Sequence, residues 1–320
     1  MSGAAGLNPT RVPTRRAFAD RMAEYGEIDA EFVVFETDIG YSTYSYLFGQ
    51  KYPERYFNMG IAESNAVSAA AGFAMEGRNV VVCGYGVFLT MRAVEAVRSF
   101  VCYPDLNVKF LSSHGGLTAA IDGATHQATE DIAFMTTIPN MMVVCPSDPV
   151  SARAMFELAL ATPGPFFTRL MRDPLFEIYT SGESFELGGS KILRPGEDIT
   201  IVSYGDIVFQ ALEAAEALAA RGIEAEVIDA YSIKPWDIEG ISASVRKTGA
   251  LLVAENHQAR NGLGYEIGIH MLKNLPLPFD NLGIPDSFGE SGDYLKVIDK
   301  YGVSRKQIVP AAERLVAGKG

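Results

Sequence analysis

The sequence predicts an α/β fold of two domains, each a mostly parallel sheet with helices on both faces. Short, continuously apolar runs rich in Val, Ile and Phe alternate with longer amphipathic segments, which is typical of parallel strands that are buried on both faces. The 320 residues suffice for two such domains. The apolar periodicity lapses at residues 179–196, where Gly, Ser, Glu and Pro cluster. We therefore expect domains at residues 1–185 and 190–320.

The elements follow in order along the chain. In the first domain we expect strands at residues 32–36, 80–84, 108–112, 142–145 and 166–170, and in the second at residues 199–204, 225–230 and 251–254. Apolar residues at helical spacing between these runs predict helices at residues 63–75, 88–102, 150–161 and 209–220. A strand followed by a helix and the next strand favours parallel pairing throughout.

Composition excludes several classes of protein. The formal net charge of −12 argues against nucleic-acid binding, which needs a basic surface. The longest apolar run is far too short to span a bilayer, and residues 1–9 lack the apolar segment of a signal peptide. Cys83, Cys102 and Cys145 are scattered without metal-ligand spacing, so we expect reduced thiols, no metal site in this chain and a cytoplasmic location.

One segment has the composition of a functional loop. Residues 112–127, SSHGGLTAAIDGATHQ, follow an expected strand and carry three glycines, His114 and His126, with few residues to pack. Long irregular loops in α/β domains are often functional. Ligands of parallel sheets bind at the carboxyl ends of the strands, where this loop begins.

A single carboxylate opens a helix of small residues. Glu63 is the only charged residue between Asn58 and Met75. Its structural explanation is that a carboxylate in the first turn complements the helix dipole. Its functional explanation is that a carboxyl group in apolar surroundings has a raised affinity for protons and can share one with a ligand.

Two segments of the chain resemble a known family. The sequence NMGIAESNAVSAAAGFA, from Asn58, resembles the segment of transketolases and 1-deoxy-xylulose-phosphate synthases that carries the catalytic glutamate. The sequence DGATHQATEDIAFMTTIPNMMVVCPSD, from Asp122, resembles their DG-THQ signature with the helix and strand after it. The resemblance runs from about Thr14 to the C-terminus and implies a thiamine-diphosphate pyrimidine-binding domain followed by a transketolase C-terminal domain.

The resemblance also implies what this chain lacks. Full-length transketolases carry a GDG motif that binds the metal ion and the diphosphate, and no GDG followed by an Asn occurs here. We therefore expect an N-terminal transketolase subunit as partner, which would hold Mg²⁺ and the diphosphate of thiamine diphosphate. Self-association through the C-terminal domain, as in the family, predicts a heterotetramer of two copies of each chain.

The resemblance assigns cofactor-binding residues. Glu63 would be the catalytic carboxyl group that exchanges a proton with the aminopyrimidine. Phe88 matches the aromatic residue that packs on this ring, and Asp38 matches a residue near the thiazolium. Where the family often has further aromatic residues, this chain has Met91 and Val94, and Met91 could fill the same slot.

The resemblance assigns substrate-binding residues as well. His114 and His126 would act in catalysis and touch substrate, with His126 and Asp122 near the hydroxyls around the carbonyl and His114 at the distal phosphate. Arg15, Ser42 and Arg172 would complete a phosphate clamp, since guanidinium groups bind phosphate bidentately.

These residues predict a split transketolase that moves a two-carbon ketol unit from a ketose phosphate to an aldose phosphate. The alternatives are half of a 1-deoxy-xylulose-phosphate synthase-like or 2-oxo acid dehydrogenase beta-like enzyme, and a non-catalytic paralogue that binds a partner. The intact DGATHQ favours the sugar enzymes, and the presence of Glu63 and both histidines disfavours the paralogue. In the segment 254–268 we expect His257 to serve architecture or subunit contact.

Overall fold

A seven-stranded sheet forms the centre of the first half in the computed structural model, which describes residues 7–174 and 176–319. Its order is β10-β5-β6-β4-β3-β1-β2, and every pair is parallel except β10 with β5. The strands are β1 Val33–Glu36, β2 Tyr56–Asn58, β3 Val80–Tyr85, β4 Val108–Ser113, β5 Met142–Val144, β6 Phe166–Arg169 and β10 Ser232–Lys234.

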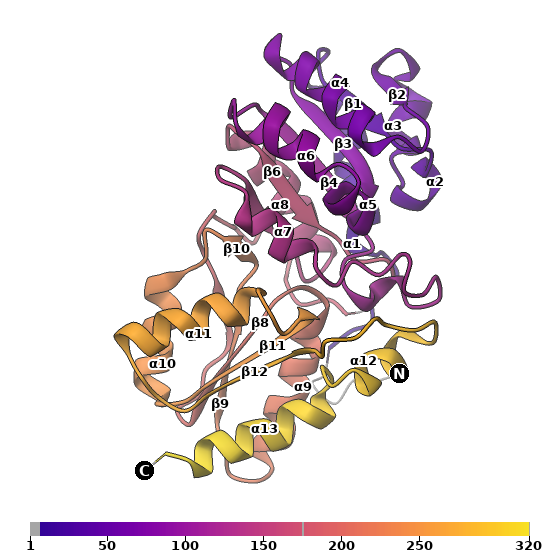
Figure 1. Cartoon of the computed structure of the whole chain (residues 1–320). Coiled ribbons are helices and arrows are strands. Elements are labelled where there is room, and N and C mark those ends of the chain that lie inside the picture. The colour runs from indigo at the N-terminus through magenta and orange to yellow at the C-terminus, as the bar shows by residue number, and fades with distance from the viewer. Residues whose placement is uncertain (1–6, 175, 320) are drawn as a thin grey trace.

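A second sheet of five strands lies in the C-terminal half, whose colour runs from salmon pink through orange to yellow in Figure 1. Its order is β12-β11-β8-β9-β7, with only β7 antiparallel. The strands are β7 Lys191–Arg194, β8 Ile199–Ser203, β9 Ala225–Asp229, β11 Leu251–Gln258 and β12 Phe279–Ile284. The two mostly parallel sheets confirm the predicted fold class.

Helices cover both faces of each sheet. Around the first sheet lie α1 Thr14–Tyr25, α2 Gly40–Thr43, α3 Tyr46–Lys51, α4 Glu63–Met75, α5 Gly86–Met91, α6 Val94–Ala96, a π-helical turn Val97–Cys102, α7 Asp131–Thr137 and α8 Pro149–Ala161. Around the second lie α9 Val208–Ala219, α10 Ile238–Thr248, α11 Leu263–Asn274, α12 Tyr294–Lys300 and α13 Arg305–Ala317. Short 3₁₀ turns are η1 Pro53–Arg55, η3 Leu117–Ala119 and η4 Gly205–Ile207.

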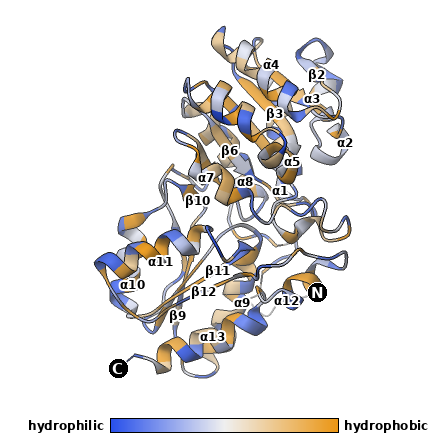
Figure 2. Cartoon of the chain, in the orientation of Figure 1, coloured by the Kyte–Doolittle hydropathy of each residue, from blue (hydrophilic) through white to orange (hydrophobic). Residues whose placement is uncertain are grey.

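Alternation along β1 shows why both faces of the first sheet need cover. Val33 and Phe35 pack with the small residues of α4, while Val34 packs with Phe18 of α1 and Phe156 of α8. Both side-chain sets are therefore removed from water, as a strand with no polar side requires. In Figure 2, β3 of the first sheet has hydrophobic colour, whereas α10, α11 and α13 around the second sheet have mixed colour.

All eight strands expected from the sequence form, but β2, β7, β10 and β12 were not expected. These four are the edge strands of the two sheets. An edge strand contacts one neighbour only and needs no continuous apolar run, so its sequence carries a weaker signal. β10 also crosses from the second half of the chain into the first sheet. The domain limits of 1–185 and 190–320 stay a prediction.

The single helix expected at residues 88–102 is wrong. It is divided into α5, α6 and a π-helical turn, with a break at Arg92 and Ala93. The carbonyl oxygen of Arg92 accepts a hydrogen bond of 2.6 Å from Ser64 Oγ of α4. In a continuous helix this carbonyl oxygen would accept from the backbone N–H four residues later along the chain. The contact with α4 takes its place and accounts for the break.

Candidate active site

Glu63 begins α4 at the carboxyl-end side of the first sheet. The turn after β2 leads into the helix, and the small residues that follow let α4 approach the sheet closely. The Glu63 side chain is 3% exposed, although a carboxylate in a first helical turn normally projects into water. Complementing the helix dipole does not require this burial. A buried carboxyl group is instead suited to exchange a proton or a hydrogen bond with a ligand.

Arg92 and Phe88 form the wall next to this carboxyl group. Arg92 Nη1 lies 3.4 Å from Glu63 Oε1 and 3.5 Å from Oε2. The guanidinium carbon lies 4.0 Å from the centroid of the Phe88 ring, which is a stacking distance. Phe88 and Arg92 are one turn apart across the break after α5. The partly exposed Phe88 ring and the buried carboxylate therefore share one planar, cationic neighbour.

Tyr85 links this wall to the glycine loop. Its ring centroid lies 4.2 Å from that of His114, 5.6 Å from that of His126 and 6.0 Å from that of Phe88. His126 also lies edge-on to Phe88, at 5.4 Å. The Tyr85 hydroxyl donates to Ser42 Oγ over 2.9 Å. One aromatic side chain at the end of β3 thus gathers residues that the sequence places more than eighty positions apart.

The first part of the glycine loop is packed, contrary to the expectation that the loop has few packing partners, whereas residues 121, 122, 124 and 125 are exposed. Residues 111–120 are all buried, and Leu117 and Ala120 belong to a core cluster of the C-terminal half. Gly116 has a φ of 57°, and a Cβ there would lie 2.5 Å from Asn256. The backbone N–H of Leu117 donates to Asn256 Oδ1 over 2.8 Å. The loop is therefore held by the second domain, which a local sequence pattern does not reveal.

A buried ion pair fixes the same loop from the sheet side. Arg169 Nε lies 2.8 Å from Asp131 Oδ2, and both side chains are at most 2% exposed. Arg169 Nη2 donates to the carbonyl oxygens of Ala128, over 3.2 Å, and Asn256, over 2.8 Å. The stem of Arg169 packs against Gly115, where a Cβ would lie 2.7 Å from Arg169 Cγ. Arg169 consequently joins β6, the glycine loop and β11.

The residues of the predicted phosphate clamp lie together. Arg15 Nη1 donates to the carbonyl oxygen and the hydroxyl of Ser42 over 2.5 and 3.1 Å, and Arg15 Nε donates to the carbonyl oxygen of Arg172 over 2.8 Å. Arg172 Nε lies 3.3 Å from Asp122 Oδ2, and its Nη1 lies 2.6 Å from Asp173 Oδ1. Two guanidinium groups and a hydroxyl therefore converge, with carboxylates that balance part of their charge.

His114 lies beside this cluster as a neutral imidazole. It is 1% exposed, Nδ1 lies 2.9 Å from Ser113 Oγ, and Nε2 lies 3.8 Å from Asp122 Oδ2. Burial, with Arg15 and Arg172 nearby, lowers the pKa of His114 to about 2. The single, 34%-exposed Asp122 does not offset burial and two cations. His114 can therefore exchange hydrogen bonds with a ligand without adding charge.

This neutral state predicts a pH-dependent stability. An unfolded histidine binds a proton below about pH 6.5, but folded His114 stays neutral down to a pKa of about 2. The unfolded state then holds more protons, so stability falls as the pH falls through this window, by at most about 1.4 kcal/mol per pH unit. We expect His114→Gln to lose less stability than the natural chain between pH 6.5 and 5 in urea titrations. Parallel curves for the two proteins would contradict this charge state.

Asp38 and Met91 lie at the edge of the candidate active site. Asp38 follows β1 with a φ of 64°, is exposed, and accepts a hydrogen bond of 3.0 Å from Asn58 Nδ2 in the segment before Glu63. Met91 ends α5 and is 43% exposed. Both lie on segments that lead to Glu63 or Phe88. Their predicted contacts with a cofactor stay predictions.

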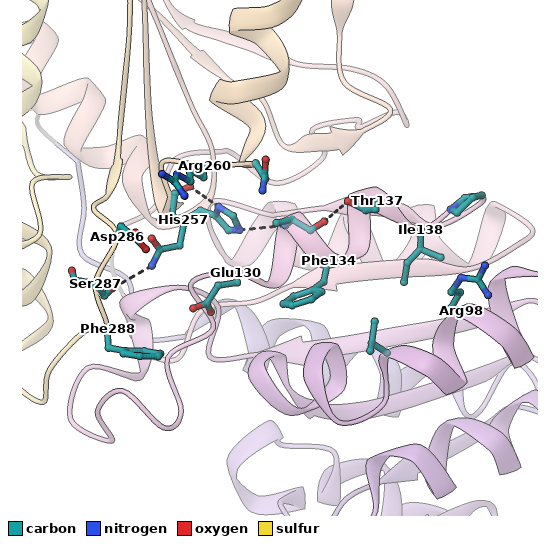
Figure 3. Close-up of a pocket in the computed structure, with 15 residues that line it drawn as sticks. Arg98, Glu130, Phe134, Thr137, Ile138, His257, Arg260, Asp286, Ser287 and Phe288 are labelled. Atoms are coloured by element: carbon teal, nitrogen blue, oxygen red, sulfur yellow. Dashed lines mark hydrogen bonds between the residues drawn. The ribbon is translucent and has the colours of Figure 1, made fainter.

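His257 lies apart from these residues, at a separate cavity. This cavity of about 730 Å³ lies between the two domains, lined by the π-helical turn, α7 and the loops after β11 and β12. Figure 3 shows that His257, near the end of β11, lies beside α7. His257 is fully buried, and Nε2 accepts from the Ala133 backbone N–H over 3.3 Å. Within the described part of the chain, the lining includes none of the residues predicted to bind cofactor or substrate.

Three residues of the site were missed from the sequence. Tyr85 and Arg92 flank Phe88. Tyr85 ends the strand before it and Arg92 follows one helical turn later, and these positions could have indicated both residues. Arg169 is the more instructive omission, since an arginine at the end of a buried strand needs a carboxylate partner. Asp131 could have been paired with it only by knowing that β4, which precedes the glycine loop and α7 along the chain, pairs with β6.

Comparison with known families identifies both halves of the chain. Residues 10–176 match the family model "Transketolase, pyrimidine binding domain", and residues 188–308 match "Transketolase, C-terminal domain". The chain belongs to the transketolase family. The pyrimidine-binding domain of this chain contains Glu63, Phe88, His114 and His126, and its C-terminal domain contains His257.

Several similar transketolase proteins have about the same length. The chain is 38% identical over 307 residues to the 6-deoxy-6-sulfo-D-fructose transketolase subunit SqwH of Clostridium sp. (strain MSTE9), covering 95% of each chain. It is 33% identical over 306 residues to a subunit of the apulose-4-phosphate transketolase of Phocaeicola vulgatus, covering 95% of this chain and 98% of that one. By contrast, it covers 51% of Transketolase-like protein 1 of Macaca fascicularis, at 33% identity.

Solved transketolase structures agree with the fold. A structure described as "Split gene transketolase, inactive beta4 tetramer" superposes with a TM-score of 0.89 and 37% identity, covering 97% of this chain and 100% of that one. A transketolase of Pichia stipitis superposes with a TM-score of 0.81 and 21% identity, covering 96% of this chain and 46% of that one, and supports the fold alone. No helix in the described residues is both long and apolar enough to cross a membrane.

Proposed function

We propose that this chain is the C-terminal subunit of a thiamine-diphosphate-dependent transketolase, which transfers a two-carbon ketol unit from a ketose phosphate to an aldose phosphate. One observation carries the proposal. The Glu63 carboxyl group is 3% exposed, and Arg92 contacts both this group and the partly exposed Phe88 ring, in the pyrimidine-binding domain. An aromatic ring near a buried carboxyl group fits a flat, basic heterocycle.

Different residues of this chain would bind the cofactor ring and move protons. Phe88 would hold the face of the aminopyrimidine, and Glu63 would hold a proton at its carboxyl oxygen and share it with a ring nitrogen. When bound, thiamine diphosphate supplies a nucleophilic carbon and an electron sink. His126, edge-on to Phe88 at 5.4 Å, would face the reacting carbons and move protons at the substrate oxygens.

A second group of residues would bind the sugar phosphate. Arg15, Ser42 and Arg172 would hold the phosphate, with neutral His114 adding a hydrogen bond. Asp122 lies 3.3 Å from Arg172 Nε and would orient a substrate hydroxyl. This arrangement extends from Phe88 through Tyr85 to Ser42. The convergence of separate segments supports a ligand with both a polar chain and an anionic end.

The other half of the site would come from a partner. Relatives of the same length are named as subunits, which supports an N-terminal transketolase subunit that holds Mg²⁺ and the diphosphate. A site between two different chains, combined with self-association, would give a heterotetramer. We expect the assembled enzyme to be cytoplasmic.

Calorimetric titration of thiamine diphosphate and Mg²⁺ tests the proposal. We expect tight binding when this chain is mixed with its N-terminal partner, and no tight binding to this chain alone. Tight binding to the chain alone would contradict a shared site. Failure of the mixture to bind would contradict the thiamine function altogether. Assays of the mixture with ketose phosphates, pyruvate plus glyceraldehyde phosphate, and 2-oxo acids then distinguish transketolase from synthase-like and dehydrogenase-like activity.

Substitution of Arg172 tests the phosphate clamp. We expect Arg172→Ala to raise the KM for phosphorylated sugars by about 10- to 100-fold, because a charge-assisted hydrogen bond to phosphate is lost. The KM for the corresponding unphosphorylated sugars should change little. Arg153→Ala is the control, because the Arg153 side chain is 42% exposed on α8. Equal increases for both classes of sugar would remove Arg172 from phosphate binding.

A further inference from the structure

Arg92 touches both groups that the proposed function assigns to the pyrimidine ring. Its guanidinium lies 3.4 and 3.5 Å from the two carboxyl oxygens of Glu63 and 4.0 Å from the centroid of Phe88. Across residues 7–174 and 176–319, it is the one side chain that donates to this carboxylate. A guanidinium is planar, cationic and edged with N–H donors. It therefore offers Glu63 and Phe88 the same interactions as a protonated aminopyrimidine.

We propose that Arg92 is a gate of the pyrimidine slot: its side chain closes the slot by stacking on Phe88 and pairing with Glu63, and cofactor entry displaces it. This inference rests on the proposed function. Both ligands use the Phe88 face and the Glu63 carboxyl group, so they exclude one another. The apparent affinity for the cofactor is then reduced by the fraction of molecules in which the gate is closed.

The contacts of Arg92 allow its side chain to be displaced from Glu63 and Phe88. Its side chain is 50% exposed, whereas Glu63 is 3% exposed, so the guanidinium reaches water by a side-chain rotation. The main chain need not move, because the Arg92 carbonyl oxygen is held by Ser64 Oγ at 2.6 Å. The ion pair is longer than a typical charge-assisted hydrogen bond and is partly exposed, so it is weak. Side-chain rotations of this kind are fast compared with turnover.

The gate also gives Glu63 a partner when the ring is out of the slot. A buried carboxylate without any donor destabilises the fold. The Arg92 guanidinium supplies that donor from the solvent side, so the chain can fold with its catalytic carboxyl group already in place. In this interpretation Arg92 is a positioning residue that holds the Glu63 carboxyl group until the ring takes its place.

Cofactor affinity of the assembled enzyme tests this proposal. Thiamine diphosphate with Mg²⁺ is titrated calorimetrically into this chain plus its N-terminal partner, as the natural protein and as Arg92→Met. We expect Arg92→Met to bind about 5- to 30-fold more tightly, the combined effect of one exposed ion pair and one cation–π contact. Arg92→Gln, which keeps a polar side chain, should also bind more tightly and serves if the Met variant does not fold.

Arg78 provides a matched control. Its guanidinium lies 5.5 Å from the Phe73 ring centroid and 2.9 Å from Glu31, so it repeats the same pair of contacts away from the site. Arg78→Met should leave the affinity unchanged. In a Glu63→Gln background, Arg92→Met should give a smaller gain, because the ion pair is already gone.

The possible failures are distinguishable. If the natural mixture does not bind the cofactor, the proposed function fails. If it binds and Arg92→Met binds equally or more weakly, Arg92 is no gate although the function stands. An equal gain in Arg78→Met would assign the effect to net charge and would also overturn the gate.

Discussion

Glu63→Gln is expected to fold normally and to lower kcat of the assembled enzyme by about 10²–10⁴-fold. Glutamine has the shape of the carboxyl group but cannot exchange a proton with a ring nitrogen. Steady-state kinetics with a ketose phosphate donor and an aldose phosphate acceptor would measure the loss. Since the change acts on the chemical step more than on substrate binding, kcat and kcat/KM should fall together.

Two comparisons make this result specific. Glu76→Gln alters the exposed carboxyl group at the other end of the same helix and should leave kcat unchanged. Thermal unfolding of Glu63→Gln should resemble that of the natural chain, because Arg92 can donate to the amide oxygen as it donates to the carboxylate. Near-normal kcat in Glu63→Gln would remove this residue from the mechanism.

Loss of Arg169 should produce the largest effect on stability. Arg169→Met leaves the Asp131 carboxylate buried without its cation and removes the side-chain donor to the carbonyl oxygens of Ala128 and Asn256, of which Ala128 keeps the backbone N–H of Gly116. We expect the free energy of unfolding to fall by about 3–5 kcal/mol, as found when one partner of a buried pair is removed. Urea titration of the natural and variant chains measures this difference.

A double substitution separates charge from packing. Asp131→Asn added to Arg169→Met removes the uncompensated charge, so the double variant should recover part of the lost stability. Arg153→Met is the control, because its pair with Glu24 is 42% and 47% exposed and should contribute less than about 1 kcal/mol. A loss below about 1 kcal/mol in Arg169→Met would show that the pair does not hold the domains and the glycine loop together.

The chain's fold class and the core of its site were predictable from local patterns. Buried parallel strands are apolar on both faces, so all eight central strands are visible in the sequence. Glu63 stands out because it is an isolated charge at the start of a helix of small residues. His114, His126 and Asp122 stand out because they share one irregular loop. Each of these signals is contained in a short stretch of chain.

Features that depend on distant contacts were not predictable in this way. The edge strands lack a strong pattern, and the break at Arg92 depends on a bond from Ser64. The first part of the glycine loop is irregular in sequence but buried, because Asn256 accepts from the Leu117 backbone N–H and the Arg169 side chain packs against Gly115.

The amino-acid sequence therefore determines the residues that can carry the chemistry, through local spacing and side-chain type. Their convergence is decided by packing: Tyr85 joins the histidines to Phe88 and Ser42, and burial keeps His114 neutral. The pairing of Arg92 with Glu63 belongs to this second class. Such contacts arise only when the folded chain excludes water around groups that are far apart in sequence, since burial is what makes each polar partner necessary.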